Sequence, residues 1–242
     1  MNIRGFRGFL FGLVALAQTD YVVAATTVQV GNAPGQSAIA QGPVETVVDM
    51  QSCRFSMPLL QDQWLKFDDF YSVFVAAEQL PKPSRAPRLW QAQTSSGADW
   101  HFESHGNLSQ PWFGLMCENS ENFSLLTDWK PPEEDAIAVQ LLRDENNRRC
   151  PATLTDQGWV SNSMAGHPDK YTFEQWGGKK SSGFIFGFLD KSRQHITRIA
   201  FCLLRGKDVL IGSAESGSSA PLAISNEEFE QIKTAVRGIA FE

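Results

Sequence analysis

The sequence lacks the short motifs that mark several common enzyme classes. It contains no G-x-S-x-G nucleophile elbow, no H-E-x-x-H zinc motif, no P-loop and no G-x-G-x-x-G dinucleotide fingerprint. Basic residues are also in deficit, since 21 Lys and Arg against 27 Asp and Glu give a formal net charge of −6. Sequence-independent nucleic-acid binding needs Lys and Arg to neutralise phosphates. We therefore expect no nucleic-acid partner, and we also expect no cofactor.

The chain has no apolar run of the roughly 20 residues that a membrane-spanning helix needs. The apolar run Phe9–Ala17 (FLFGLVALA) is shorter, follows Arg4 and Arg7, and precedes the small-residue site Val23-Ala24-Ala25. This layout is typical of a secretory signal peptide, which we place at residues 1–25. We expect an exported protein, periplasmic or secreted, with no membrane insertion after processing.

The four cysteines include no C-x-x-C pair, so the sequence suggests neither a thioredoxin-like site nor a zinc knuckle. In an exported protein an even set of cysteines favours disulfides, and we expect all four to be paired. Three connectivities are open. Of these we favour Cys117–Cys150, which closes a local loop, together with Cys53–Cys202, which ties the start of the domain to its end.

Residues 26–48 hold Gly, Pro, Gln and Ser without sustained periodicity, and we expect a flexible leader there. Residues 49–242 form one domain, with ample length for a hydrophobic core. In it, the alternation of apolar and polar residues from Cys53 to Met57 predicts a strand that stops at Pro58. Further strands are predicted at 88–93, 99–104, 112–117, 171–176, 184–189, and, as a hairpin, 196–204 with 209–214.

Three segments favour helices. Large apolar side chains recur at three or four residues between Gln61 and Leu80, although Val73-Phe74-Val75 also suits a strand. Pro132 and the acidic residues after it predict a helix start that continues to Leu142. Ser225 with Glu228 forms a capping box. It opens a C-terminal helix whose apolar stripe is Phe229, Ile232, Val236 and Ile239.

Strand runs with few helices, the last of them closing the chain, predict an α+β fold. We expect an antiparallel sheet with the C-terminal helix packed on one face, stapled by the disulfides. This order of elements resembles the PsbP-like group of exported proteins. The resemblance covers Arg54-Phe55-Ser56-Met57-Pro58, an early strand that ends in Pro, and residues 196–241, a long hairpin followed by a helix. Such proteins mostly bind or assemble, so the resemblance implies a binding role.

One strand carries a candidate metal site. In Trp100-His101-Phe102-Glu103-Ser104-His105, side chains alternate between the faces of the strand. His101, Glu103 and His105 then share one face, and two imidazoles with a carboxylate suit zinc or copper. The other interpretation is an ordinary solvated face, because same-face positions lie about 7 Å apart and converge poorly on one ion.

The seven tryptophans supply candidate contact residues. Trp129 and Trp176 lie beside Pro, Gly or polar residues, where exposed indoles anchor protein partners or stack on sugar rings. The segment Gln175–Lys180 is the best single candidate, with Trp176, Lys179 and Lys180 as binding residues. The other interpretation is partial burial, with each indole N–H finding a partner.

Two classes of function remain. The first is a non-enzymatic exported interaction protein, either an accessory subunit of an envelope assembly or an acidic inhibitor or immunity protein, with a protein partner in the cell envelope. The alternative is a small secreted hydrolase, either metal-dependent through His101, Glu103 and His105 or serine-based without a recognisable nucleophile elbow. Export, acidity, the tryptophans and the missing catalytic motifs favour the first class. A carbohydrate ligand also fits exposed indoles.

Overall fold

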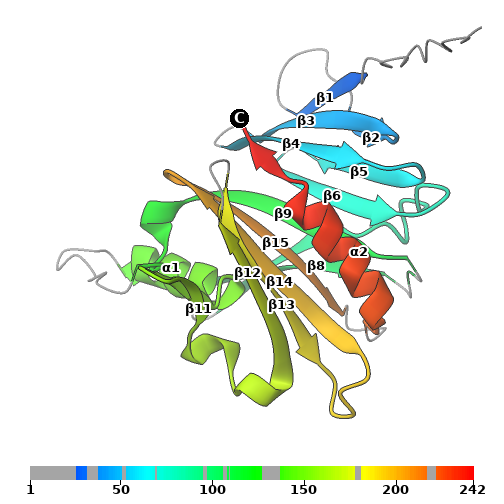
Figure 1. Cartoon of the computed structure of the whole chain (residues 1–242). Helices are drawn as coiled ribbons and strands as arrows, with labels where there is room; N and C mark the ends of the chain where they lie inside the picture. The colour runs from blue at the N-terminus through cyan, green and yellow to red at the C-terminus, as the bar shows by residue number, and fades with distance from the viewer. Residues whose placement is uncertain are drawn as a thin grey trace, which may run out of the picture.

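The computed structural model describes most of the chain after residue 25, so the expected signal peptide lies outside it. The described residues are 26–31, 38–50, 53–68, 70–94, 97–105, 108, 110–126, 137–177, 181–216 and 222–242. They form sixteen strands in three sheets and two α-helices (Figure 1). The fold is therefore β-rich, and the prediction of an α+β fold built on one sheet is wrong.

Two of the sheets contain nearly all the strands. The smaller has the order β1-β3-β4-β16 and comprises β1 (Thr27–Gly31), β3 (Val44–Met50), β4 (Cys53–Leu59) and β16 (Ala240–Phe241). The larger has the order β12-β13-β14-β15-β9-β6-β5-β2, with β7 paired to β8 and β8 to β15. Its strands are β2 (Ile39–Gln41), β5 (Gln63–Asp68), β6 (Tyr71–Ala76), β7 (Arg88–Thr94), β8 (Gly97–Ser104), β9 (Trp112–Asn119), β12 (Tyr171–Gly177), β13 (Ser182–Leu189), β14 (Ile196–Arg205) and β15 (Asp208–Ser216). A separate hairpin joins β10 (Ala152–Thr155) to β11 (Gly158–Ser161).

The hairpin of β14 and β15 is confirmed. Gly206 adopts φ +60° in its turn, a conformation that glycine reaches without steric cost. Gly212 of β15 faces the ring of Phe201 so closely that a Cβ would not fit. Phe113 of β9 contacts both Phe201 and Phe74, with ring centroids 5.2 and 4.7 Å apart. These phenylalanines form the centre of the core.

The helix expected between Gln61 and Leu80 is wrong. This segment forms the antiparallel hairpin of β5 and β6, in which Leu65 and Phe67 are buried on alternate positions. The β-branched Val73 and Val75 favour the strand, as the alternative interpretation required. The flexible leader is also wrong where the structure describes it, because residues 26–48 include β1, β2 and most of β3. The strand that begins at Cys53 continues through Pro58 to Leu59.

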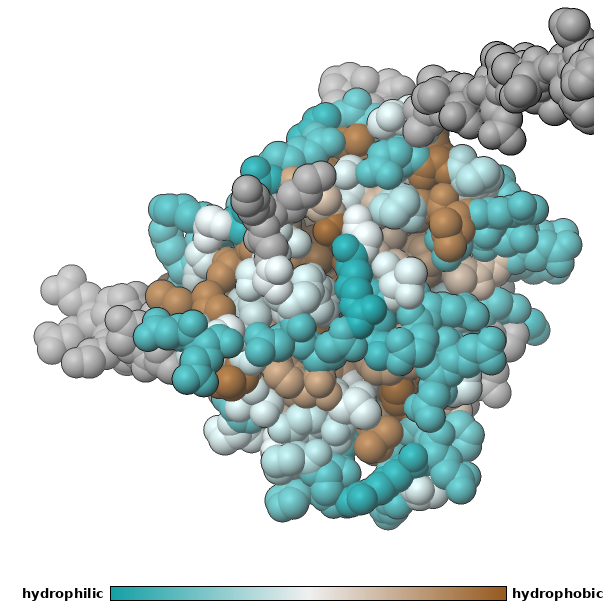
Figure 2. Space-filling view, viewed as in Figure 1, coloured by the Kyte–Doolittle hydropathy of each residue, from teal (hydrophilic) through white to brown (hydrophobic). Residues whose placement is uncertain are grey.

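Helix α2 (Asn226–Arg237) begins where the sequence indicates. The Ser225 side chain accepts a hydrogen bond from the Glu228 backbone N–H, and the Glu228 side chain accepts one from the Ser225 N–H. The predicted apolar stripe is buried: Phe229, Ile232, Val236 and Ile239 are at most 5% exposed. In Figure 1 the helix crosses in front of strands of the larger sheet, and Figure 2 shows hydrophilic residues over its outward face.

Helix α1 (Ile137–Arg149) has a polar inward face. The expected start near Pro132 lies outside the described residues, and the helix continues past Leu142 to Arg149. Arg149 is buried, donates from Nε to the Trp100 carbonyl at 2.8 Å and pairs with Asp99 at 2.6 Å. Asn147 accepts the Ser124 N–H at 2.8 Å. Hydrogen bonds, rather than an apolar stripe, therefore fix this helix to its neighbours.

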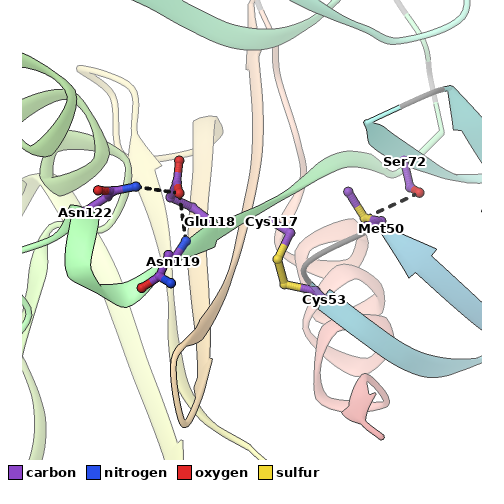
Figure 3. Close-up of a disulfide and its surroundings, with 7 residues drawn as sticks. All are labelled: Met50, Cys53, Ser72, Cys117, Glu118, Asn119 and Asn122. Carbon is purple, nitrogen blue, oxygen red and sulfur yellow. Dashed lines mark hydrogen bonds between the residues drawn. A yellow bond between two sulfur atoms is a disulfide. The ribbon is translucent and has the colours of Figure 1, made fainter. Parts of the chain in front are cut away.

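All four cysteines are paired, as predicted, but the favoured connectivity is wrong. Cys53 bonds to Cys117, and Cys150 to Cys202. Figure 3 shows the first bridge between β4 of the smaller sheet and β9 of the larger one. The second ties the end of α1 to β14. Each pair has a Cα–Cα distance of 5.8 Å, set by strand packing that loop length alone does not reveal.

Candidate binding groove beside helix α2

A cavity of about 680 Å³ lies alongside α2. One wall is the helix. The others are the turn between β4 and β5 and the residues at the end of β6. Its lining residues are Pro58, Leu60, Gln61, Asp62, Gln63, Ala76, Ala77, Glu78, Gln110, Glu227, Glu230, Gln231, Thr234 and Ala235.

The helix contributes a regular stripe to this cavity. Glu227, Glu230, Gln231, Thr234 and Ala235 follow the spacing i, i+3, i+4, i+7 and i+8, which is one face of an α-helix. Because the adjacent face is buried in the core, this stripe is left to form the cavity wall. A rise of 1.5 Å per residue over the stripe corresponds to a wall about 12 Å long.

The opposite wall is held by the turn between β4 and β5. Asp62 has φ +60°, a left-handed conformation in which Asp and Asn are enriched among non-glycine residues. The Leu60 N–H donates to Oε1 of Gln63 at 2.8 Å, and the Ala77 N–H donates to the Asp62 carbonyl at 2.8 Å. The turn and the end of β6 therefore form one connected wall.

A second cavity of about 830 Å³ adjoins the first, and Ala77, Glu78 and Gln110 line both. Its remaining lining residues follow β6 and precede β9: Gln79, Leu80, Pro81, Lys82, Ser84, Arg85 and Leu108. The Arg85 N–H donates to the Lys82 carbonyl at 2.8 Å and closes the turn there. We use the name α2 groove for the residues that line these two cavities.

Charge is distributed unevenly along the α2 groove. Among the described residues, four carboxylates line the first cavity, Asp62, Glu78, Glu227 and Glu230, and no Lys or Arg does. Glu230 pairs with Lys233 of the next helical turn. Among the residues that the structure describes, the other three form no ion pair. Basic residues, Lys82 and Arg85, line only the second cavity.

The first cavity also has an apolar part, formed by Pro58, Leu60, Ala76, Ala77 and Ala235. Leu60 is 59% exposed, an unusual position for a large aliphatic side chain, whereas Ala77 and Ala235 are 7% exposed. Four glutamine amides lie among these residues and offer both donors and acceptors. Apolar surface bordered by a few polar groups is typical of ligand-binding clefts.

The candidate metal residues do come together, His101 and Glu103 on β8 and His105 directly after it. Glu103 is buried, and Nε2 of His101 and of His105 each lie 3.5 Å from its carboxylate. Arg88 of β7 lies 3.7 Å from Oε1 of Glu103, and the ring of Trp90 lies against that of His101 with the ring centroids 4.6 Å apart. Over the described residues, however, no set of three His, Cys, Asp or Glu side chains is placed to hold a metal ion. The structure gives the metal-site hypothesis no support, since Glu103 is engaged with its neighbours.

The tryptophan candidates are only partly described. Trp176 lies on β12, in the strand predicted at 171–176, opposite Gly183 of β13, and packs half-buried against the core. Trp129, Lys179 and Lys180 lie outside the described residues. Trp112 and Trp159, at 1% exposed, are core residues, in line with the packing interpretation.

None of the residues that line the α2 groove is predicted from the sequence as a site residue. One signal was available, because the capping box and apolar stripe of α2 define which helix positions remain outside the core. The wall opposite the helix could not be predicted, because the sequence favours a helix between residues 61 and 80, where the structure has β5 and β6. A groove formed by two distant segments needs the tertiary fold to be seen.

No family model, curated protein or solved structure matches this chain. The resemblance to the PsbP-like group therefore stays a prediction. Neither helix in the described part of the chain has the length and apolar character that crossing a membrane requires.

Proposed function

We propose that this chain is an exported interaction protein, periplasmic or secreted, which binds a segment of a protein partner in the α2 groove. The two disulfides support export, because such bonds form and persist in oxidising compartments. The apolar run and small-residue site at the start of the sequence support it as well.

The observation that carries the proposal is the extent of the α2 groove, which continues from one cavity into a second that shares three lining residues with it. Its helical wall alone is about 12 Å long, and an extended peptide rises about 3.3 Å per residue, so this wall accommodates about four residues. The second cavity continues the groove towards Lys82 and Arg85. A cleft built from two adjoining cavities suits an extended segment better than one compact small molecule.

The composition of the groove favours binding over hydrolysis. In the part of the chain that the structure describes, no His, Cys or Ser lines the first cavity, and its apolar residues and amides suit recognition of a backbone and its side chains. The alternative, a hydrolase with a metal at His101, Glu103 and His105, receives less support, because Glu103 is buried and lies against both imidazoles and Arg88. We therefore propose a non-enzymatic role.

Site-specific photocrosslinking tests this proposal. A benzophenone amino acid replaces Gln231 in the groove, or Gln157, an exposed control in the turn between β10 and β11, and the protein is exported by its native cell. We expect one protein to be crosslinked from position 231 and not from 157. Crosslinked peptides of that protein, identified by mass spectrometry, should define one continuous segment.

A matched pair of variants makes the result specific. Gln231→Trp fills the groove without changing charge, whereas Gln157→Trp adds the same side chain elsewhere. Capture of the crosslinked partner should fall about tenfold or more for Gln231→Trp, the loss expected when a contact of about 1.4 kcal/mol is removed. Equal capture by both variants, at unchanged melting temperatures, would contradict binding in the groove.

A further inference from the structure

The α2 groove carries an electrostatic imbalance that identifies the chemistry of its occupant. Asp62, Glu78 and Glu227 face one cavity without a cation from the described residues, and Glu230 shares Lys233 with Glu174. Like charges gathered in one cleft repel one another, and a ligand of opposite charge relieves that repulsion. The first cavity therefore favours a cation.

The apolar surface beside these carboxylates narrows the choice of cation. Lys and Arg have aliphatic stems that lie along apolar surface while the charged head reaches polar groups. In the α2 groove Leu60, Ala77 and Ala235 provide such a surface, and Asp62 and Glu227 lie beside it. A small inorganic cation would leave this apolar surface unused.

The charges that line the second cavity indicate which end of the groove binds the positive charge of the ligand. Lys82 and Arg85 line it, and they repel a cationic side chain placed there. The complementary position for a positive charge is thus the end of the groove beside α2. Resting on the proposed function, we infer that the bound segment of the protein partner carries a Lys or Arg whose stem lies on Leu60 and Ala235 and whose head contacts Asp62 and Glu227.

The test uses a display library of random nonamer peptides selected on the full-length exported protein, with counterselection on Gln231→Trp. Enrichment of Lys and Arg is the expected result. The most enriched peptide is then synthesised, together with versions in which its basic residues are replaced by Gln or by Glu. Fluorescence anisotropy gives the dissociation constant of each.

Variants of the protein test whether the carboxylates of the groove, and not the net charge of the protein, determine the affinity for a basic peptide. Asp62→Asn with Glu227→Gln removes two groove carboxylates, and Asn tolerates the left-handed φ of position 62. Asp144→Asn with Asp156→Asn removes two exposed carboxylates outside the groove lining. We expect the groove pair to weaken the basic peptide about tenfold and the control pair to have less than a twofold effect. Raising salt from about 0.1 to about 1 M shortens the Debye length from about 10 to about 3 Å and should weaken binding similarly.

Three outcomes are distinct. Lys and Arg enrichment, with loss of binding in the groove pair alone, supports the inference. Enrichment of neutral or acidic peptides that Gln231→Trp blocks would overturn the inference and leave the proposed function standing. No enrichment, or binding that Gln231→Trp does not affect, would overturn both.

Discussion

Glu78, two residues after the end of β6, and Glu227, in the first turn of α2, line the same cavity. They are far apart in the sequence, and the packing of α2 beside the end of β6 brings them to one cavity. The groove is therefore a property of the tertiary fold, and conditions that release α2 should abolish binding.

The disulfide connectivity leads to the first prediction. Proteolysis of the non-reduced protein should give peptides that join Cys53 to Cys117 and Cys150 to Cys202. Replacing both Cys53 and Cys117 by Ala should lower the free energy of unfolding by about 4 kcal/mol on the chain-entropy account of a bridge spanning a sequence separation of 64. Mass spectrometry and urea unfolding measure the two results. A peptide that joins Cys117 to Cys150 would contradict the structure.

Phe229 provides a second prediction, on the docking of α2. Its ring lies about 3 Å from the position that a Cβ on Gly187 of β13 would occupy, and the side chain is 5% exposed. Phe229→Ala should therefore lower the free energy of unfolding by about 3–5 kcal/mol. Phe70→Ala, at a phenylalanine that is 44% exposed, should cost less than about 1 kcal/mol. Equal costs would show that α2 is not docked.

The turn between β13 and β14 gives a prediction on pH. Hydrogen bonds lower the pKa of Asp190 from its ordinary 3.8 to about 2, and the bond from the Ser192 hydroxyl is the largest cause. Because the folded state has the lower pKa, the stability from this carboxylate is present above about pH 4 and is lost as pH falls through about 2. Ser192→Ala should move the Asp190 titration upward in a carboxyl NMR experiment. Ser163→Ala, at an exposed serine elsewhere, should leave it unchanged.

The sequence predicted elements whose signals are local. The capping box of Ser225 and Glu228 sets the start of α2, and Gly206 sets the turn between β14 and β15. The sequence-based prediction is wrong where one segment fits both the helical and the strand periodicity. Between Gln61 and Leu80 the spacing of large side chains suits a helix, but the paired strands bury Leu65 and Phe67 on alternate residues. Pairing with β2 and β9 decides the outcome, and neither partner is adjacent in sequence.

The disulfide pairing and the environment of the candidate site residues could not be predicted from local sequence signals, because both depend on the tertiary structure. Loop length favoured a bridge between Cys117 and Cys150, yet β9 brings Cys117 beside Cys53 of β4. Alternation on β8 correctly placed His101, Glu103 and His105 together, but could not show that Glu103 is buried. The strand predicted at 171–176 is confirmed, but the sequence left open whether the Trp176 indole is exposed, and its partial burial follows from the packing of β12.

The central claim, that the α2 groove binds a basic segment of a protein partner, is tested most directly by NMR. The isotope-labelled protein is titrated with the selected nonamer, and backbone amide shifts are followed. We expect the largest shifts at Gln63, Ala77, Glu78 and Gln231, which line the groove. Shifts that concentrate instead on β12 around Trp176, with these groove amides unmoved, would contradict the account.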